Sequence, residues 1–234
     1  MQPTPWLVDK NLEISPEGAK EISVYIPEHF RVRGQASAIA FMRANPFAIL
    51  VSNTSDGPFA THVPVVICEN DDRITLRGHV AKANPHWRSI EQQPLCLMIF
   101  HGSHAYISPS HYNAREAVPT WNYGAVHAYG KARVYAEHAD LLKMLHDLIA
   151  TFETAYAQQW DSLSEAYQTR MLAHIVGFEI PVEKVEAKFK LSQNRTPDEQ
   201  QNIIDALCPV SDSVVSGIAR LMSEQGLGRK KGEK

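Results

Sequence analysis

The stretch between Ala105 and Gly130 holds the densest group of side chains that could bind a ligand. It reads AYISPSHYNAREAVPTWNYGAVHAYG and is rich in Tyr, Trp, His and Asn. Its two prolines favour extended backbone, and its apolar residues follow neither a helical nor a strand period. Because flat rings with polar tips suit a flat ligand with polar edges, we expect this segment to contribute to a binding site.

A second candidate site lies in GHVAKANPHW (78–87), where a predicted strand ends and a predicted helix begins. A helix N-terminus presents unpaired N–H groups, Lys82 adds a positive charge, and His79 and Asn84 can donate hydrogen bonds. These groups would suit a phosphate. The same residues also allow a structural interpretation, in which the lysine is solvated, the asparagine caps the helix, the proline begins it and the tryptophan packs in the core.

Other catalytic chemistries find no motif in this chain. Most of its eleven histidines, among them His62, His79, His101, His104, His111 and His127, lie in the half that carries the aromatic segment. No HExxH or Cys/His spacing is present, so no metal site is predicted. We expect His101 and His104 at the end of a strand. Neither GxSxG nor GxGxxG nor a Walker loop occurs, and Ser108 before Pro109 is typical of a turn. The sequence therefore assigns no catalytic residue.

Composition and charge restrict the class of protein. The chain has 234 residues, 44% of them hydrophobic, which allows a sizeable core in one or two domains. The formal net charge of −3 gives no support to binding DNA or a membrane surface, and the apolar runs are too short to span a bilayer. Cys68, Cys96 and Cys208 are far apart in sequence, so we expect reduced thiols and a cytoplasmic protein.

Hydrophobic periodicity predicts the secondary structure. Strands are expected over 47–52, 59–68, 73–79, 95–102, 125–136 and 175–191, and turn residues at Asp56 and Gly57 indicate an antiparallel meander. Helices are expected over 36–45, 85–93, 139–159, 197–207 and 212–225, with a further one after a capping box at Ser162 and Glu165. This order favours a mainly antiparallel β-barrel with peripheral helices.

The predicted elements and the chain ends suggest four regions. Residues 1–23 lack the pattern of a secretory signal and are expected to be a poorly structured extension. The other regions are a barrel domain over 24–195 that includes helices at about 139–173, C-terminal helices over 196–228, and a basic tail over 229–234. The two last helices contain Arg220 as the only basic residue of 211–225, which favours packing or dimer contact over DNA reading.

Six short motifs occur in one order between Val24 and the C-terminal helices. They are YIPEHF (25–30), THVPV (61–65), GHVAKANPHW (78–87), AYISPS (105–110), VPTWNYGAVHAYG (118–130) and FKLSQNR (189–195). Together they resemble the PaiB family of FMN-binding proteins, which are described as negative transcriptional regulators. The resemblance implies an antiparallel split β-barrel related to the pyridoxamine-phosphate oxidase fold, working as a homodimer with FMN at the subunit interface.

The resemblance also implies which residues hold FMN. Those expected at the phosphate are Lys82, His79 and Asn84. Those expected along the ribityl chain or the ring edge are Thr61, His62 and Val63. The ring pocket would be closed by Trp121, Asn122 and Tyr123, and further donors would be Lys190, Gln193 and Arg195. FMN needs an anion site, scattered donors and a flat slot, and the chain supplies all three.

One position departs from the family, and three functions stay open. Related sequences tend to read ISPSWY, whereas His111 replaces the tryptophan here, which weakens stacking and either places a titratable group near the flavin or is a surface substitution. The functions are a regulator of the PaiB type, an FMN-dependent oxidoreductase with an unknown substrate, and a haem-binding split barrel. The charge of the chain does not support direct DNA binding.

Overall fold

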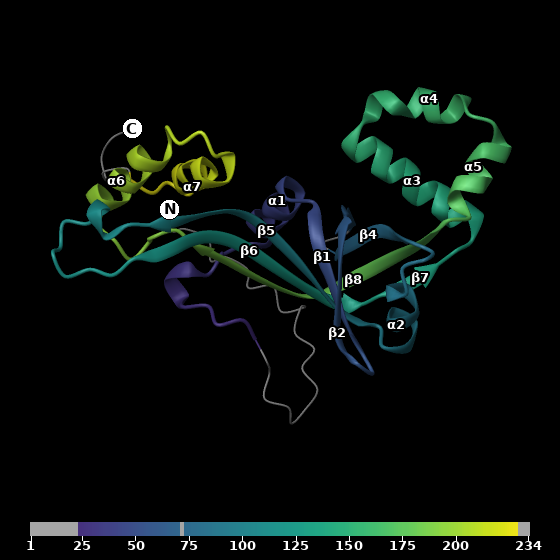
Figure 1. The fold of residues 1–234 in the computed structure, drawn as a ribbon, viewed down its shortest axis with the longest axis horizontal. Helices are drawn as coiled ribbons and strands as arrows, with labels where there is room; N and C mark the ends of the chain where they lie inside the picture. Colours follow the sequence, from purple (N-terminus) through teal and green to yellow (C-terminus); the bar gives the residue numbers. More distant parts are fainter. Residues whose placement is uncertain (1–22, 71–72, 229–234) are drawn as a thin grey trace, which may run out of the picture. The chain divides into compact units, whose positions relative to one another are not determined.

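The computed structural model describes residues 23–70 and 73–228, which form a mainly antiparallel β structure with peripheral helices (Figure 1). Its sheet has the strand order β2-β1-β5-β6-β8-β4-β3, and β7 pairs with β8. The strands are β1 Phe47–Thr54, β2 Gly57–Pro64, β3 Val66–Asn70, β4 Arg73–Ala81, β5 Leu95–Ile107, β6 Thr120–Lys131, β7 Arg133–Tyr135 and β8 Ile175–Lys190. The helices are α1 Gln35–Ala44, α2 His86–Gln92, α3 His138–Phe152, α4 Ala157–Ser162, α5 Glu165–Leu172, α6 Pro197–Leu207 and α7 Ser213–Glu224.

A single buried residue, Val65, connects the two ends of the sheet. β2 and β3 follow each other in sequence yet lie at opposite ends of the strand order, so the sheet must curl until these ends approach. The approach is tight at Gly78 on β4, where a Cβ atom would lie 2.9 Å from the Pro64 carbonyl oxygen. The sheet is not closed. The prediction of one strand over 59–68 within a simple meander is therefore wrong, because the chain turns a corner at Val65.

The described residues group into two compact units. Unit 1 contains 49–98 and 128–186, and unit 2 contains 25–48, 99–127 and 187–228. The long strands β5, β6 and β8 each contribute residues to both units. The expected barrel boundary at residue 195 stays a prediction. The expected extension over 1–23, apart from Ser23, and the expected tail over 229–234 lie outside the described residues.

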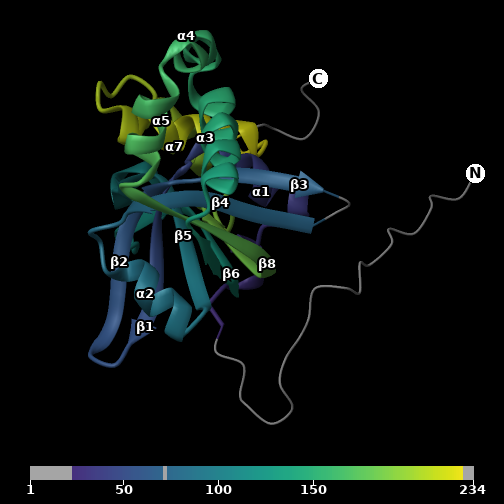
Figure 2. The same cartoon turned by 90° about the vertical axis from the view of Figure 1, so that its right-hand side faces the viewer.

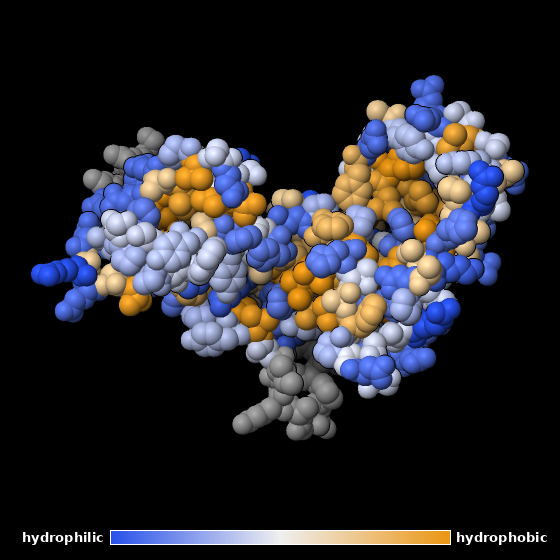
Figure 3. Space-filling view, viewed as in Figure 1, coloured by the Kyte–Doolittle hydropathy of each residue, from blue (hydrophilic) through white to orange (hydrophobic). Residues whose placement is uncertain are grey.

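The helices α3, α4 and α5 form a group on one side of unit 1, where Figure 2 shows one end of α3 at β4. Leu141, Met144 and Leu148 of α3 pack with Val66 of β3 and Leu172 of α5 in one buried cluster. Figure 3 shows apolar side chains gathered at this helical group. This packing holds α3 beside the polar residues of β4 and β8 that are described below.

The prediction of one helix over 139–159 is confirmed as far as Phe152 and wrong beyond it, because the helix ends at Glu153. Glu153 has φ −155° and ψ 71°, which ends α3, and the Thr151 hydroxyl donates to the Asp147 carbonyl in the last turn. The break lets α4 bury Trp160, which is 5% exposed. The predicted cap is also displaced: Ser164, rather than Ser162, accepts the N–H of the third following residue.

Unit 2 is built around Phe41 of α1, which packs against Phe189 of β8 with ring centroids 5.0 Å apart. A Cβ atom at Gly102 or Gly124 would lie 2.7 or 2.6 Å from the Phe41 ring, so both strands need glycine there. The predicted capping box of α6 is confirmed, since Thr196 and Glu199 bond each other's backbone N–H groups.

The strands on both sides of the aromatic segment extend further into it than predicted. β5 continues to Ile107 and includes His101 and His104 in its interior, and β6 begins at Thr120. Along β6, Trp121 is 53% exposed and Asn122 is fully buried. The strand period escaped detection because the inward-facing positions hold asparagine and glycine while the outward-facing ones hold large rings.

Candidate functional site

The turn between β4 and α2 in unit 1 presents Lys82 to solvent. Its backbone is fixed from both sides: the Lys82 N–H donates to the His174 carbonyl at 2.7 Å, and the Lys82 carbonyl accepts from the Trp87 indole at 3.0 Å. The Lys82 side chain is exposed, and its ammonium has no hydrogen bond or ion pair within the described residues. The turn therefore offers a rigidly mounted positive charge that is free to meet an anion.

A buried hydrogen-bond network stands directly behind this turn. His86, the first residue of α2, is 0% exposed and joins Ser52 Oγ through Nε2 at 2.9 Å and Thr61 Oγ1 through Nδ1 at 2.7 Å. Asn84 donates to Thr61 Oγ1 at 3.2 Å and accepts from the His86 backbone N–H at 3.0 Å. Burial lowers the pKa of His86, which favours the neutral ring. The network ties the turn to β1 and β2.

The structure thus brings Thr61 and Asn84 together, and Lys82 is exposed as the structural interpretation expects. Two parts of that interpretation are wrong: Pro85 rather than Asn84 is the N-cap residue of α2, and Trp87 is only half-buried. The phosphate role of Lys82 stays a prediction.

His79 lies on the opposite face of β4 from Gly78, which approaches β2. Its Nδ1 is buried without a partner in the described structure, and burial lowers its pKa. Of the remaining candidates in unit 1, Val63 is buried and His62 is exposed.

An exposed face of unit 2 carries rings from β5 and β6. The His101 and His104 rings lie 4.9 Å apart between centroids, and Trp121 lies 6.1 Å from both His104 and Tyr106. Trp121 and Tyr106 are 53% and 51% exposed. Burial, and to a smaller extent the charge of His104, lowers the pKa of His101. This face, which we call the aromatic face, could stack on a flat ligand or pack against another protein.

Asn122 points away from the aromatic face. It is fully buried, exchanges hydrogen bonds of 3.0 and 3.1 Å with Ser192, and lies 3.8 Å from the Met222 sulfur. Alternate residues of a strand face opposite sides, so Trp121 and Tyr123 share one face and Asn122 the other. Within this chain, Asn122 joins β6 to the end of β8 and to α7.

The three later candidates lie at the end of β8 and just after it in unit 2, but have different surroundings. The Lys190 ammonium donates to the Thr120 hydroxyl. Both polar atoms of the Gln193 side chain bond backbone groups of Leu191 and Phe189, so they close the strand end. The Arg195 guanidinium stacks on the Tyr112 ring at 3.8 Å. Of the three, Gln193 has its side-chain amide engaged within its own segment.

Among residues 23–70 and 73–228, no three His, Cys, Asp or Glu side chains gather as a metal site requires. The three cysteines have free thiols, and burial raises the pKa of Cys96 to about 11. No helix in the described part of the chain has the length and apolar character needed to cross a membrane.

Comparison with known proteins places this architecture. The profile of the family described as "Putative FMN-binding domain" matches residues 24–184, well over half of the chain. The chain belongs to this FMN-binding family. It is 38% identical to "Protease synthase and sporulation protein PAI 2" of Bacillus subtilis over 204 residues, which cover 86% of this chain and 98% of that protein. The resemblance to the PaiB family is therefore confirmed.

Two solved structures show the same fold at low sequence identity. The flavocytochrome Anf3 from Azotobacter vinelandii matches 68% of this chain and 69% of its own with a TM-score of 0.54 and 15% identity. The conserved hypothetical protein Rv2991 from Mycobacterium tuberculosis matches 73% of this chain and 92% of its own with a TM-score of 0.52 and 13% identity. The predicted split-barrel fold is confirmed.

FMN is the cofactor of this family, and the donor groups described above fit it. In unit 1, the unpaired Lys82 ammonium suits a phosphate, and the Thr61 hydroxyl suits a hydroxylated chain. In unit 2, the exposed rings of Trp121 and Tyr106 suit a flat heterocycle. When bound, FMN could supply hydride and electron chemistry, and these side chains would bind and orient it.

Two residues of the unit 1 network were missed by sequence reasoning. Ser52 lies inside an apolar strand, and nothing in its spacing distinguishes it from a surface serine. His86 had a detectable signal, because His86 and Ile90 are four residues apart on the inward face of α2.

Proposed function

We propose that this protein works as an FMN-binding homodimer of the PaiB type that regulates transcription. Its support is the family match together with a relative, at 38% identity, that is named as a protease synthase and sporulation protein. The proposal of a homodimer rests on the aromatic face, where Trp121 and Tyr106 expose about half of their surface. The three free thiols favour a cytoplasmic location.

One observation supports a particular location for the FMN phosphate: the Lys82 ammonium is unpaired within the described residues, on a turn whose backbone is held by hydrogen bonds. We expect Lys82→Ala to raise the FMN dissociation constant by roughly 10- to 100-fold, because an ionic hydrogen bond to phosphate contributes about 1.5–3 kcal/mol. Fluorescence quenching of FMN measures this. Lys131→Ala, which changes another exposed lysine of unit 1, is the matched control. Unchanged affinity in Lys82→Ala would overturn the phosphate assignment.

Regulation through a protein partner fits the charge better than direct DNA contact. The net charge is −3, and α7 carries Arg220 as its only basic residue. We expect no sequence-selective DNA binding by the FMN-loaded protein in a salt titration. Salt-dependent binding with a clear preference for one DNA sequence would contradict this part of the proposal and leave FMN binding intact.

An FMN-dependent oxidoreductase is the second candidate, favoured by the paired rings of His101 and His104 on the aromatic face. Titratable rings beside a flavin could hold or move a proton at a substrate atom. Oxidation of reduced nicotinamide by the FMN-loaded protein, lost in His104→Phe but retained in Lys131→Ala, would favour the enzyme over the regulator.

A further inference from the structure

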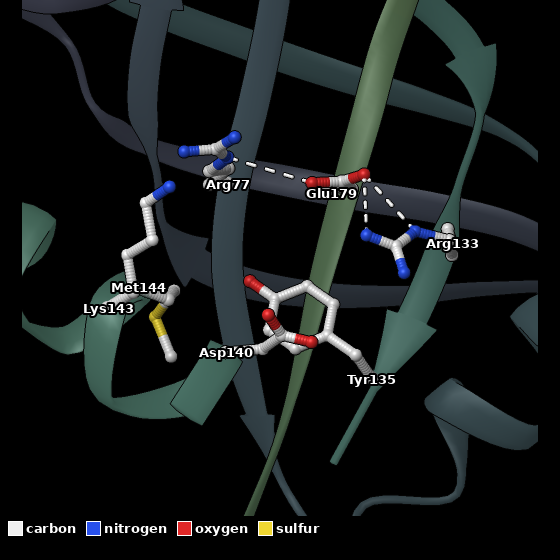
Figure 4. A pocket seen from close by; sticks show the side chains of 7 residues that line it. All are labelled: Arg77, Arg133, Tyr135, Asp140, Lys143, Met144 and Glu179. Atoms are coloured by element: carbon white, nitrogen blue, oxygen red, sulfur yellow. Dashed lines mark hydrogen bonds and ion pairs between the residues drawn. The ribbon is translucent and has the colours of Figure 1, made fainter. Parts of the chain in front are cut away.

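A polar pocket of about 180 Å³ lies in unit 1 between the sheet and α3, and none of the residues considered for FMN lines it (Figure 4). Arg77, Arg133, Tyr135 and Glu179 line it from the strands, and Asp140 and Lys143 line it from the first turns of α3. Its volume is below that of common drug-sized sites, so it has room only for a small molecule.

The floor of the pocket is a row of charges set by strand register. Arg133 of β7 and Arg77 of β4 both pair with Glu179 of β8, one from each side. The Arg133 guanidinium donates to Glu179 Oε1 at 3.0 and 3.2 Å, and Arg77 Nε lies 3.7 Å from Oε2. One carboxylate therefore stands between two guanidinium groups. Arg77 also contacts Asp147 at 3.3 Å, which fastens α3 to the sheet.

Lys143 adds a third positive charge that the described structure does not neutralise. No hydrogen bond or ion pair joins its ammonium to a described residue, and Figure 4 shows it pointing toward the same end of the pocket as the Arg77 guanidinium. The lining holds three cations and two carboxylates, and Asp147 outside it pairs with Arg77, so Lys143 is the lining cation that lacks a carboxylate partner among the described residues. Two like charges directed to one place repel each other unless an anion lies between them.

The pocket also offers a neutral donor. Burial, reinforced by the negative charge of Glu179, raises the pKa of Tyr135 to about 12, so its phenol keeps its proton at neutral pH. The Tyr135 ring lies over Gly177, where a Cβ atom would come within 2.3 Å of it, so the glycine lets the ring sit flat against β8. A hydroxyl held this way can donate to an oxygen of a ligand.

We propose that this pocket binds a small oxyanion, a phosphate or carboxylate group of a metabolite, between Lys143, Arg77 and the Tyr135 hydroxyl. Arginine and lysine together with a phenol form charge-assisted hydrogen bonds with such groups. The site shares no residue with those assigned to FMN, so it does not depend on the proposed function. In a regulator, it would take an effector separate from the flavin.

The test is a titration of the full-length, FMN-loaded protein with inorganic phosphate and, separately, with succinate, at constant ionic strength kept with chloride. Amide NMR shifts follow binding. We expect saturable shifts in β7 and the facing part of β8 with at least one of the two probes, without release of FMN. Lys143→Gln should weaken binding at least about fivefold, since an ionic hydrogen bond is lost.

Two variants complete the design. Lys131→Gln removes an exposed lysine of unit 1 that does not line the pocket and should bind the probe like the parent, whereas Tyr135→Phe should weaken binding by a smaller factor than Lys143→Gln. The proposal is overturned if neither probe gives saturable shifts beyond those of chloride, if Lys143→Gln binds as tightly as the parent, or if the probe acts by displacing FMN.

Discussion

Histidine occurs in two opposite environments in this protein. In unit 1, His86 is 0% exposed and both of its ring nitrogens bond hydroxyl groups, from Ser52 and Thr61. In unit 2, His101 and His104 stand 4.9 Å apart on a strand face with exposed rings around them. A buried histidine with satisfied nitrogens holds elements together, whereas paired rings on an open face are available to a ligand or a partner. The environment decides the role, and the residue type does not.

The largest expected effect is on His86. His86→Ala removes both hydrogen bonds, leaves a cavity behind α2 and deprives the buried Ser52 hydroxyl and the half-buried Thr61 hydroxyl of their partner, so we expect a loss of about 2–4 kcal/mol in the free energy of unfolding. Urea denaturation measures it. His101→Ala, on the aromatic face, should change stability by less than about 0.5 kcal/mol. Equal losses in the two variants would remove the contrast between the environments.

Asn122 extends the comparison to a buried polar residue of unit 2. Its side-chain amide exchanges two hydrogen bonds with the Ser192 hydroxyl of the same unit. Because Asn122→Ala removes both of these hydrogen bonds, we expect a loss of about 1–3 kcal/mol in the free energy of unfolding. Its neighbour Tyr123 is the control, because Tyr123→Ala truncates a half-buried side chain on the opposite face of β6. Thermal or urea unfolding decides. A larger loss in Tyr123→Ala would show that the aromatic face, rather than Asn122, stabilises unit 2.

The effect of pH on stability should be smaller than the effects of these substitutions, and the free energy of unfolding should fall as the pH is lowered. Burial lowers the folded pKa of His86, so below the unfolded value near 6.5 the unfolded chain takes up the proton first. The stability that this residue contributes is present above about pH 6.5 and is lost as pH falls through the folded pKa. His79 and His101 shift in the same direction and add to the slope.

The comparison with a non-titrating variant isolates the share of His86. Urea titrations of the parent and of His86→Gln between pH 7.5 and 5 should give a shallower loss for the variant. An identical slope would mean that His86 keeps its ordinary pKa in the folded protein.

The smallest effect on stability is expected at Trp121, where the proposed homodimer predicts an effect on subunit association instead. Trp121→Ala exposes no core and should leave the free energy of unfolding of the monomer within about 0.5 kcal/mol. If a second copy covers the aromatic face, the variant should weaken association by about tenfold or more, because tryptophan is a common interface anchor. Sedimentation equilibrium measures it. Unchanged association would place the dimer contact elsewhere.

Elements defined by strong local signals were predictable. The capping box at Thr196 and Glu199, with Pro197 between them, located α6 to the residue, since these side chains bond their own backbone. The predictions failed where contacts between distant parts of the chain determine where an element ends. Glu153 breaks a helix whose periodicity continues, because α4 must turn to bury Trp160. Val65 splits an apolar run, because the two halves belong to opposite ends of a curled sheet.

By itself, the sequence determined the family, the split-barrel fold, the FMN cofactor and the lysine at the β4–α2 turn. These inferences depend on motifs and on local periodicity, which involve only residues close together in the sequence. Only the tertiary structure decided that His86 closes a network with Ser52 and Thr61, that Asn122 faces inward, and that Arg133, Glu179 and Arg77 form one row under α3. These arrangements depend on strand register and on which faces meet. Neither is set by neighbouring residues, since a one-residue change of register turns every side chain to the other face.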